Sequence, residues 1–267
     1  MLGRLPGAVL RAGLVLLLCL LPAAMLPDTT RNALQASLIA GGLVAAFVLH
    51  EYAARQPLLI DFRFAPPYNR ARAVTLAALL IALTLLVRAG ADGGAAASAL
   101  AARADRLAAL MDGTPGPVAM AGRLAEGWGM AEIAPLMRRA VALALTIAAA
   151  AVLIFGLLLW VFRWPARRER FNLWANLPTF QPVEGRLAER RLRLQGGLYL
   201  LAGLTLPFWT AILAERAGGL VAPVILASFR TLVWTVAIWA FLAASFCLRG
   251  LAMIKIAWLV RRARGAG

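Results

Sequence analysis

The side chains in this sequence that could do chemistry are few and lie far apart. The one histidine, His50, precedes Glu51, and such a pair can titrate near neutral pH or bind a ligand. With no second histidine, we interpret the pair instead as a cap where an apolar segment meets the membrane interface. Cys19 and Cys247 lie inside apolar runs and form no CxxC pair, so we interpret both as small core residues. We therefore expect no metal site and no cofactor.

Sequence patterns of catalysis are also missing. The chain contains no phosphate-cradling glycine loop, HExxH, GxSxG or EF-hand pattern. Its six apolar segments hold no Asp, Glu or Lys, which argues against a proton-driven pump, because relays in membranes usually need such groups. We predict that the protein is not an enzyme. A polar group near Pro207, formed by Tyr199, Thr205 and Thr210, leaves a small transporter or permease-like subunit as the alternative.

The segment Arg163–Arg193 holds eight arginines and no lysine, between long apolar runs. Arginine this dense beside a membrane span marks a loop that stayed in the cytoplasm. Aromatic residues accompany the arginines here and in the loop 51–72, and the combination is typical of partner anchors and of headgroup anchors. A Phe-Arg-aromatic tripeptide common to the two loops is a weak sign of duplication. The candidate contact residues are Arg63, Phe64, Tyr68, Arg167, Arg168, Arg170, Phe171, Trp174, Arg190 and Arg191.

Arg230 is the only charged residue in the apolar run Leu220–Leu248. An unpaired charge deep in lipid costs at least ~2.5–3.5 kcal/mol, so we expect the span to begin after it. Arg230 would then snorkel to the interface, bind an anion or lipid headgroup, or pair with Glu215.

The composition places the chain in a membrane. Hydrophobic residues make up 62% of it, and 28 basic against 12 acidic residues give a net charge of +16. In a soluble protein this balance would suggest nucleic acid. Here the basic residues flank apolar spans, so we expect anionic lipid headgroups and a membrane-protein partner, and no nucleic acid. The strong preference for Arg over Lys, with abundant Ala and Leu, suggests a bacterial source.

We predict an all-α polytopic membrane protein, a single domain with a bundle of about six transmembrane helices. The third span has only 15 uninterrupted uncharged residues, so it must either borrow residues from 68–72 or thin the bilayer locally. Separate basic helices are expected over 179–194 and 251–264, and aromatic residues of the loop 51–72, including Phe62, are expected at headgroup level. The predicted spans are 9–26, 33–49, 73–87, 140–162, 197–213 and 231–248.

The longest loop, 88–139, contains a predicted amphipathic helix over 93–112. Leu100, Ala104, Leu107 and Met111 fall on one face of it, so it would lie on the outer membrane surface or on top of the bundle. Glycines in the segment after it predict irregular or weakly helical structure there.

Charge assigns the sides of the membrane. The N-terminus, the loops 51–72 and 163–196, and the tail from Arg249 carry most of the basic residues, so we expect them in the cytoplasm. The loop 88–139 would be periplasmic and the membrane a bacterial inner membrane. The first apolar run resembles a secretory signal, but its cleavage site is poor, so we interpret it as an uncleaved span. The expected function is that of a non-enzymatic accessory or assembly subunit acting through its cytoplasmic loops.

Overall fold

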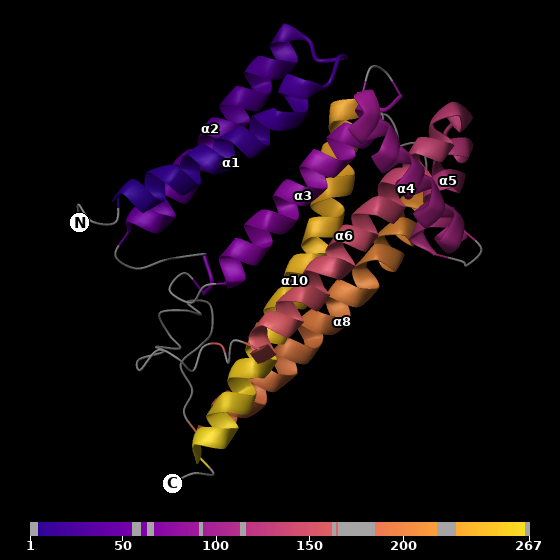
Figure 1. The fold of residues 1–267 in the computed structure, drawn as a ribbon. Coiled ribbons are helices and arrows are strands. Elements are labelled where there is room, and N and C mark those ends of the chain that lie inside the picture. The colour runs from indigo at the N-terminus through magenta and orange to yellow at the C-terminus, as the bar shows by residue number, and fades with distance from the viewer. Residues whose placement is uncertain are drawn as a thin grey trace.

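A computed structural model describes residues 5–54, 60–62, 67–90, 93–112, 116–161, 164, 185–217 and 228–264 (Figure 1). The described residues form eight α-helices and one short 3-10 helix, and six of the helices are long and apolar enough to cross a membrane. The predicted all-α, multi-pass membrane architecture is confirmed at this level. The helices are α1 Leu5–Met25, α2 Arg31–Ala53, α3 Tyr68–Arg88, α4 Gly94–Asp112, α5 Pro117–Gly127, α6 Ala134–Val161, α8 Gly185–Ala217 and α10 Phe229–Arg264, and the 3-10 helix is Ala131–Ile133.

The six long helices alternate in direction along the bundle (Figure 1). The start of α1, the end of α2, the start of α3, the end of α6, the start of α8 and the end of α10 lie at one end, which we call the loop end. Helices α4 and α5 lie at the other, which we call the distal end. The two connections predicted to be cytoplasmic therefore leave the bundle at the same end as both termini of the described chain.

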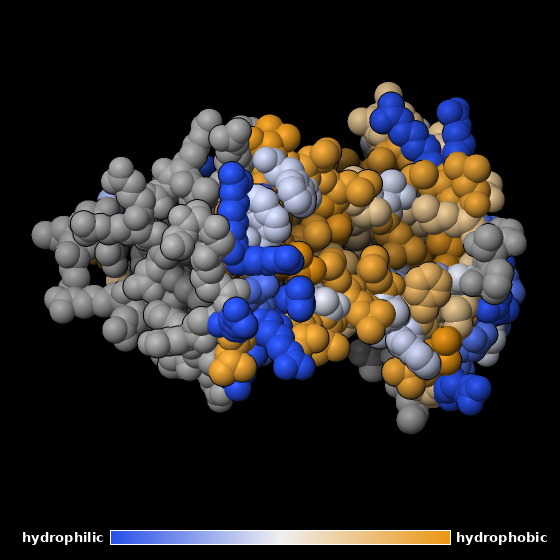
Figure 2. Space-filling view, turned by 90° about the horizontal axis from the view of Figure 1, so that it is seen from below, coloured by the Kyte–Doolittle hydropathy of each residue, from blue (hydrophilic) through white to orange (hydrophobic). Residues whose placement is uncertain are grey.

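Two apolar clusters form the core. The larger one lies among α3, α4, α5, α6 and α10, and includes the predicted face of α4. The smaller one lies at the loop end, around Phe62, Phe155 and Leu248. Much of the outer surface is apolar as well: Leu43 is 70% exposed and Leu153 is 69% exposed. Figure 2 shows apolar surface between polar groups toward either end on the face in view, which suits a bundle surrounded by lipid.

Helices α8 and α10 pack with their backbones almost in contact. A Cβ added to Gly250 would lie 2.6 Å from the Gly196 carbonyl oxygen, and one added to Gly203 would lie 2.7 Å from the Ala243 carbonyl oxygen. Gly196 and Gly203 are seven residues apart, about two helical turns, so they lie on one face of α8. Small residues of this kind allow helices in membranes to approach closely. The sequence analysis did not single out this glycine seam.

The hairpin of α1 and α2 also contains a close glycine contact. A Cβ on Gly41 would lie 2.8 Å from the Cβ of Cys19, whereas one on Gly42 would meet no atom within 4 Å among the described residues. Cys19 and Cys247 are free thiols, partly buried and buried. This fits their interpretation as small packing residues.

Several predicted boundaries were wrong. The basic segment ending at Leu194 and the span 197–213 belong to one helix, α8, and the segments 231–248 and 251–264 belong to one helix, α10. Gly196 and Gly250, which lie where these segments meet, are inside the α8–α10 seam, where packing compensates their low helix propensity. The segment after α4, expected to be irregular or weakly helical, forms the helix α5, which is the second of these two alternatives. The third span does borrow residues as predicted, since α3 begins at Tyr68.

Helices α8 and α10 are longer than a membrane span requires. They contain 33 and 36 residues, which at 1.5 Å per residue makes them roughly 50 and 54 Å long, against about 30 Å of hydrocarbon. The basic start of α8 and the basic end of α10 lie at the loop end, beyond the apolar part of each helix.

Candidate functional site

The connection between α2 and α3 is fastened to the bundle by a buried ion pair. Asp61 is 5% exposed, and its Oδ2 lies 3.0 Å from Nη1 of Arg249 on α10. Its backbone carbonyl accepts a hydrogen bond of 2.8 Å from Asn69 Nδ2, and the neighbouring Ile60 N–H donates to Glu51 Oε2 at 3.2 Å. Side chains from α2, α3 and α10 thus hold three consecutive residues of this connection, Ile60 to Phe62, in place.

The surroundings of Asp61 shift the pKa of its carboxyl group in both directions. Burial raises the pKa of its carboxyl group, and the guanidinium groups of Arg249 and Arg72 lower it by less, so the net direction is upward. Its Oδ1 is buried with no hydrogen-bond partner among the described residues. The ionised form of this carboxyl group is therefore less favourable here than in water, even with two arginines near it.

Phe62 is a second fastening point, next to Asp61. Its φ of +52° is in the left-handed region, which is uncommon for a residue with a bulky side chain. The side chain is 1% exposed, and its ring centroid lies 4.7 Å from that of Tyr68 and 5.5 Å from that of Trp164. Tyr68 in turn packs edge-on against Phe155 of α6 at 6.0 Å. These contacts keep the backbone in a conformation that it would otherwise avoid.

Arg249 and Arg72 lie over aromatic rings of α8 and α10. The guanidinium carbon of Arg249 is 4.6 Å from the ring centroid of Tyr199, and that of Arg72 is 5.5 Å from the ring centroid of Phe241. Such cation–π contacts are worth about 0.5–2 kcal/mol, more when desolvated. We call the residues that meet here the loop-end cluster: Asp61, Phe62, Tyr68, Arg72, Tyr199 and Arg249.

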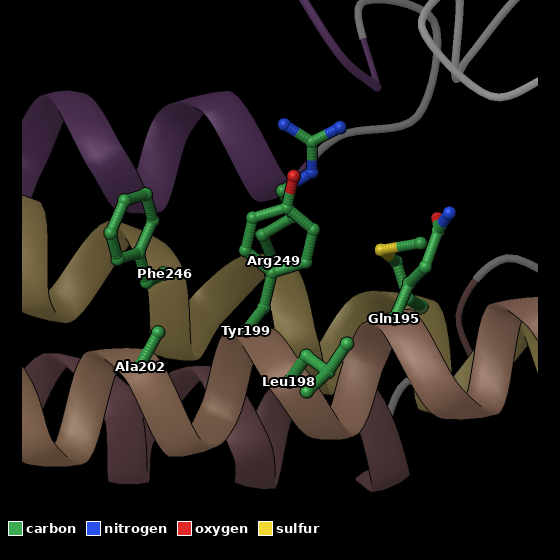
Figure 3. A pocket seen from close by; sticks show the side chains of 7 residues that line it. Gln195, Leu198, Tyr199, Ala202, Phe246 and Arg249 are labelled. Atoms are coloured by element: carbon green, nitrogen blue, oxygen red, sulfur yellow. The ribbon is translucent and has the colours of Figure 1, made fainter.

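A pocket of 430 Å³ lies between α8 and α10, beside the loop-end cluster. Figure 3 shows the Arg249 guanidinium and the Tyr199 hydroxyl pointing in the same direction, with Phe246 and Ala202 on one side of them and Gln195 on the other. The lining residues are Gln195, Leu198, Tyr199, Ala202, Phe246, Arg249 and Met253.

Another aromatic pair surrounds Lys255, the one lysine of the chain. Its Nζ lies 4.4 Å from the ring centroid of Trp160 and 4.6 Å from that of Trp258. The two contacts join the end of α6 to the end of α10 and account for the burial of the lysine.

Ion pairs at the distal end join α4, α5, α6 and α8. Arg123 lies 3.2 Å from Glu215, Arg138 lies 3.1 Å from Glu126, and Arg139 pairs with Asp105. All are between partly exposed side chains, and pairs of this kind contribute about 0–1 kcal/mol each. We assign them a structural role.

The structure describes only some of the predicted contact residues. Arg190 and Arg191 are exposed on the basic start of α8. Tyr68 is 2% exposed, so its expected place at the headgroup level was wrong, as was that of Phe62; both rings are covered by protein instead of lipid headgroups. The remaining candidates lie outside the described residues: Arg63, Phe64, Arg167, Arg168, Arg170, Phe171 and Trp174.

Arg230 lies in the first turn of α10 and has protein partners. It donates to the Ala33 carbonyl at 2.6 Å and to Ser37 Oγ at 3.2 Å, both on α2. The alternative pairing with Glu215 is not observed, because Glu215 binds Arg123. Arg230 thus joins the α1–α2 hairpin to α10, and an anion or lipid site there stays a prediction.

The polar group that suggested a transporter is not gathered in one place. Tyr199 lines the pocket, but Thr205 donates to the Leu201 carbonyl at 2.8 Å. Thr210 donates to the Leu206 carbonyl at 2.7 Å and accepts from Trp239 Nε1 at 2.6 Å. The threonine hydroxyls are occupied within the protein.

Sequence reasoning missed the link between Asp61 and Arg249, which are 188 positions apart. A weak local signal did exist: Asp61 follows the apolar run LLI, and Arg249 is the only charged residue between Arg230 and Lys255. Among the described residues, no group of three His, Cys, Asp or Glu side chains could hold a metal ion. Comparison of the chain with protein-family models, curated proteins and solved structures finds no match.

Proposed function

We propose that this chain is a multi-pass protein of a bacterial inner membrane and a non-enzymatic accessory or assembly subunit of a larger membrane complex. Its working surface is the loop end, which faces the cytoplasm, and α4 and α5 face the periplasm. The observation that supports this best is the fastening of the α2–α3 connection by Asp61 and Phe62. A surface held in one conformation loses less entropy when a partner binds.

The charge distribution supports the same surface. Exposed arginines cover the start of α8, and Arg261 and Arg262 are exposed at the end of α10. Both segments lie at the loop end (Figure 1). Arginine-rich surfaces next to a membrane attract acidic headgroups and acidic segments of partner proteins.

Co-purification from cells that express the protein at its native level tests this proposal. In the Arg190→Ala/Arg191→Ala variant, we expect a chemically crosslinked partner to be recovered about tenfold less, since truncating arginine anchors typically costs 1–2 kcal/mol. The matched control is Arg103→Ala/Arg106→Ala, which removes two exposed arginines from α4 at the distal end and should leave recovery unchanged. A wild-type protein that always purifies alone, or an equal loss in both variants, would contradict the proposal.

A small transporter or permease-like subunit is the alternative, and the pocket between α8 and α10 is the observation in its favour. The glycine seam and the occupied threonine hydroxyls weigh against a substrate path along the same helix pair. A chain that purifies alone and moves a solute across the membrane of reconstituted vesicles would favour this alternative over the subunit.

A further inference from the structure

The pocket between α8 and α10 has an ordered polarity. On α8 its lining residues recur every three or four positions, Gln195, then Leu198 and Tyr199, then Ala202, and so share one helix face. Helix α10 runs in the opposite direction. On it, Phe246 lies across from Ala202, and Arg249 lies beside Tyr199 and nearer the loop end (Figure 3). The polar side chains therefore gather toward the loop end of the pocket, where Met253 also lies, and the other end is apolar.

This order of polar and apolar lining residues matches the order of headgroups and hydrocarbon in a membrane around the bundle. Gln195 follows the basic start of α8, and beyond it the helix is apolar as far as Leu213. The polar end of the pocket thus lies where the headgroup region is expected, and Ala202 and Phe246 lie at the depth of the hydrocarbon. Leu198, which is 64% exposed, lies on the lipid-facing side of α8. An occupant of this pocket would have a polar head and an apolar tail, oriented like the lipids around it.

The charged side chains beside the pocket determine whether an anionic or a cationic headgroup is favoured. Arg249 lines the pocket and Asp61 pairs with it, while Arg72, in the same loop-end cluster beside the pocket, lies 5.7 Å from the ring centroid of Tyr68. Two guanidinium groups against one carboxylate leave this cluster positive. Arginine is well suited to phosphate, because its planar fork of N–H groups matches the phosphate oxygens.

We propose that this pocket binds an anionic phospholipid. The phosphate lies beside Arg249 and Gln195, and one acyl chain runs along Leu198, Ala202 and Phe246. The pocket volume of 430 Å³ lies within the roughly 300–1,000 Å³ of ligand sites in proteins. The bound lipid would bridge α8 and α10 and would stabilise the loop-end cluster. This proposal does not depend on the partner proposed above.

Native mass spectrometry after purification, and thermal unfolding in nanodiscs, test the proposal. We expect the wild-type protein to retain phosphatidylglycerol in preference to phosphatidylcholine, and to unfold at a higher temperature when phosphatidylglycerol replaces part of the phosphatidylcholine. The Ala202→Phe variant fills the apolar part of the pocket without changing any charge. It should retain about tenfold less phosphatidylglycerol and lose the shift.

A second variant removes the headgroup contact. Because Arg249→Gln alone would leave Asp61 without its ion pair, the double variant Asp61→Asn/Arg249→Gln is used, and it should also lose the preference for phosphatidylglycerol. Arg103→Gln, an exposed arginine of α4 outside both the pocket and the loop end, is the control and should keep it.

Three outcomes would overturn the proposal. One is equal retention of both lipids by the wild-type protein. Another is an Arg103→Gln variant that loses the preference as fully as the pocket variants do, which would indicate surface charge alone. The third is stabilisation of detergent-purified protein by inorganic phosphate to the same extent as by phosphatidylglycerol, which would make the site one for free anions.

Discussion

At the scale of single residues, Asp61 is unusual because it is a buried carboxyl group that burial and arginine influence in opposite directions. Burial is the larger effect, so its pKa in the folded protein is above the usual value. An acid whose pKa is raised by folding binds its proton more tightly in the folded state. It therefore favours folding most when protonated, and this contribution is lost as the pH rises through the folded-state pKa.

The variant Asp61→Asn tests this balance. We expect the free energy of unfolding of the wild-type protein, measured relative to Asp61→Asn, to fall as the pH rises above the ordinary carboxyl pKa of about 4, with a slope of at most about 1.4 kcal/mol per pH unit, and to level off above the folded-state pKa. The ion pair with Arg249 forms only with the ionised carboxylate, so its effect is already contained in the pKa of Asp61, and arginine itself does not titrate in this range. Reversible unfolding in mild detergent at a series of pH values gives the measurement. A difference that grows with pH would mean that the charged carboxylate is favoured by folding.

At the scale of helices, the α8–α10 seam depends on glycine at particular positions. In Gly250→Ala the new methyl group would lie 2.6 Å from the Gly196 carbonyl oxygen, a backbone atom, so the helices must separate. We expect a loss of about 1–3 kcal/mol of stability, the usual cost of overpacking. The loss is read from the midpoint of thermal unfolding or of denaturation in a graded detergent mixture.

Gly197→Ala is the matched control for this prediction. A Cβ at Gly197 would meet no described atom within 4 Å, although the residue is adjacent to Gly196 on the same helix. Alanine there should leave stability unchanged or raise it by up to about 1 kcal/mol through helix propensity. Equal effects of Gly197→Ala and Gly250→Ala would show that the seam is not closely packed.

The seam also shows what the sequence could predict and what it could not. Long uncharged runs predicted six helices of spanning length, since lipid requires about 20 consecutive apolar residues. The predicted helix ends in α8 and α10 were wrong. In the sequence alone a glycine favours a helix end, whereas here Gly196 and Gly250 pack against the facing helix and stay within continuous helices. The pairing of Asp61 with Arg249 joins distant parts of the chain, so no local periodicity reports it. Phe62 and Tyr68 were placed in the lipid interface for the same reason: their protein neighbours come from α6 and from Trp164.

At the scale of the whole molecule, the six long helices put both termini at one end, but the arrangement alone leaves open which side of the membrane that end faces. Arginine supplies the direction, because basic loops tend to stay in the cytoplasm. The exposed Arg190 on α8 and the exposed Arg103 on α4 lie at opposite ends and can report the two sides.

Cysteine labelling in intact cells tests the direction. In a Cys19→Ala/Cys247→Ala background, we expect Arg103→Cys to react with a membrane-impermeant maleimide before lysis, and Arg190→Cys to react only after lysis. Both positions are exposed on described helices, so a failure to label Arg190→Cys in intact cells reports the membrane barrier rather than burial, provided that lysis restores labelling. The reverse pattern would place the loop end in the periplasm. The proposed partner surface would then face the periplasm, which contradicts the proposed function. The lipid pocket would be unaffected, because its proposal depends on the depth of the pocket in the membrane and not on which side the loop end faces.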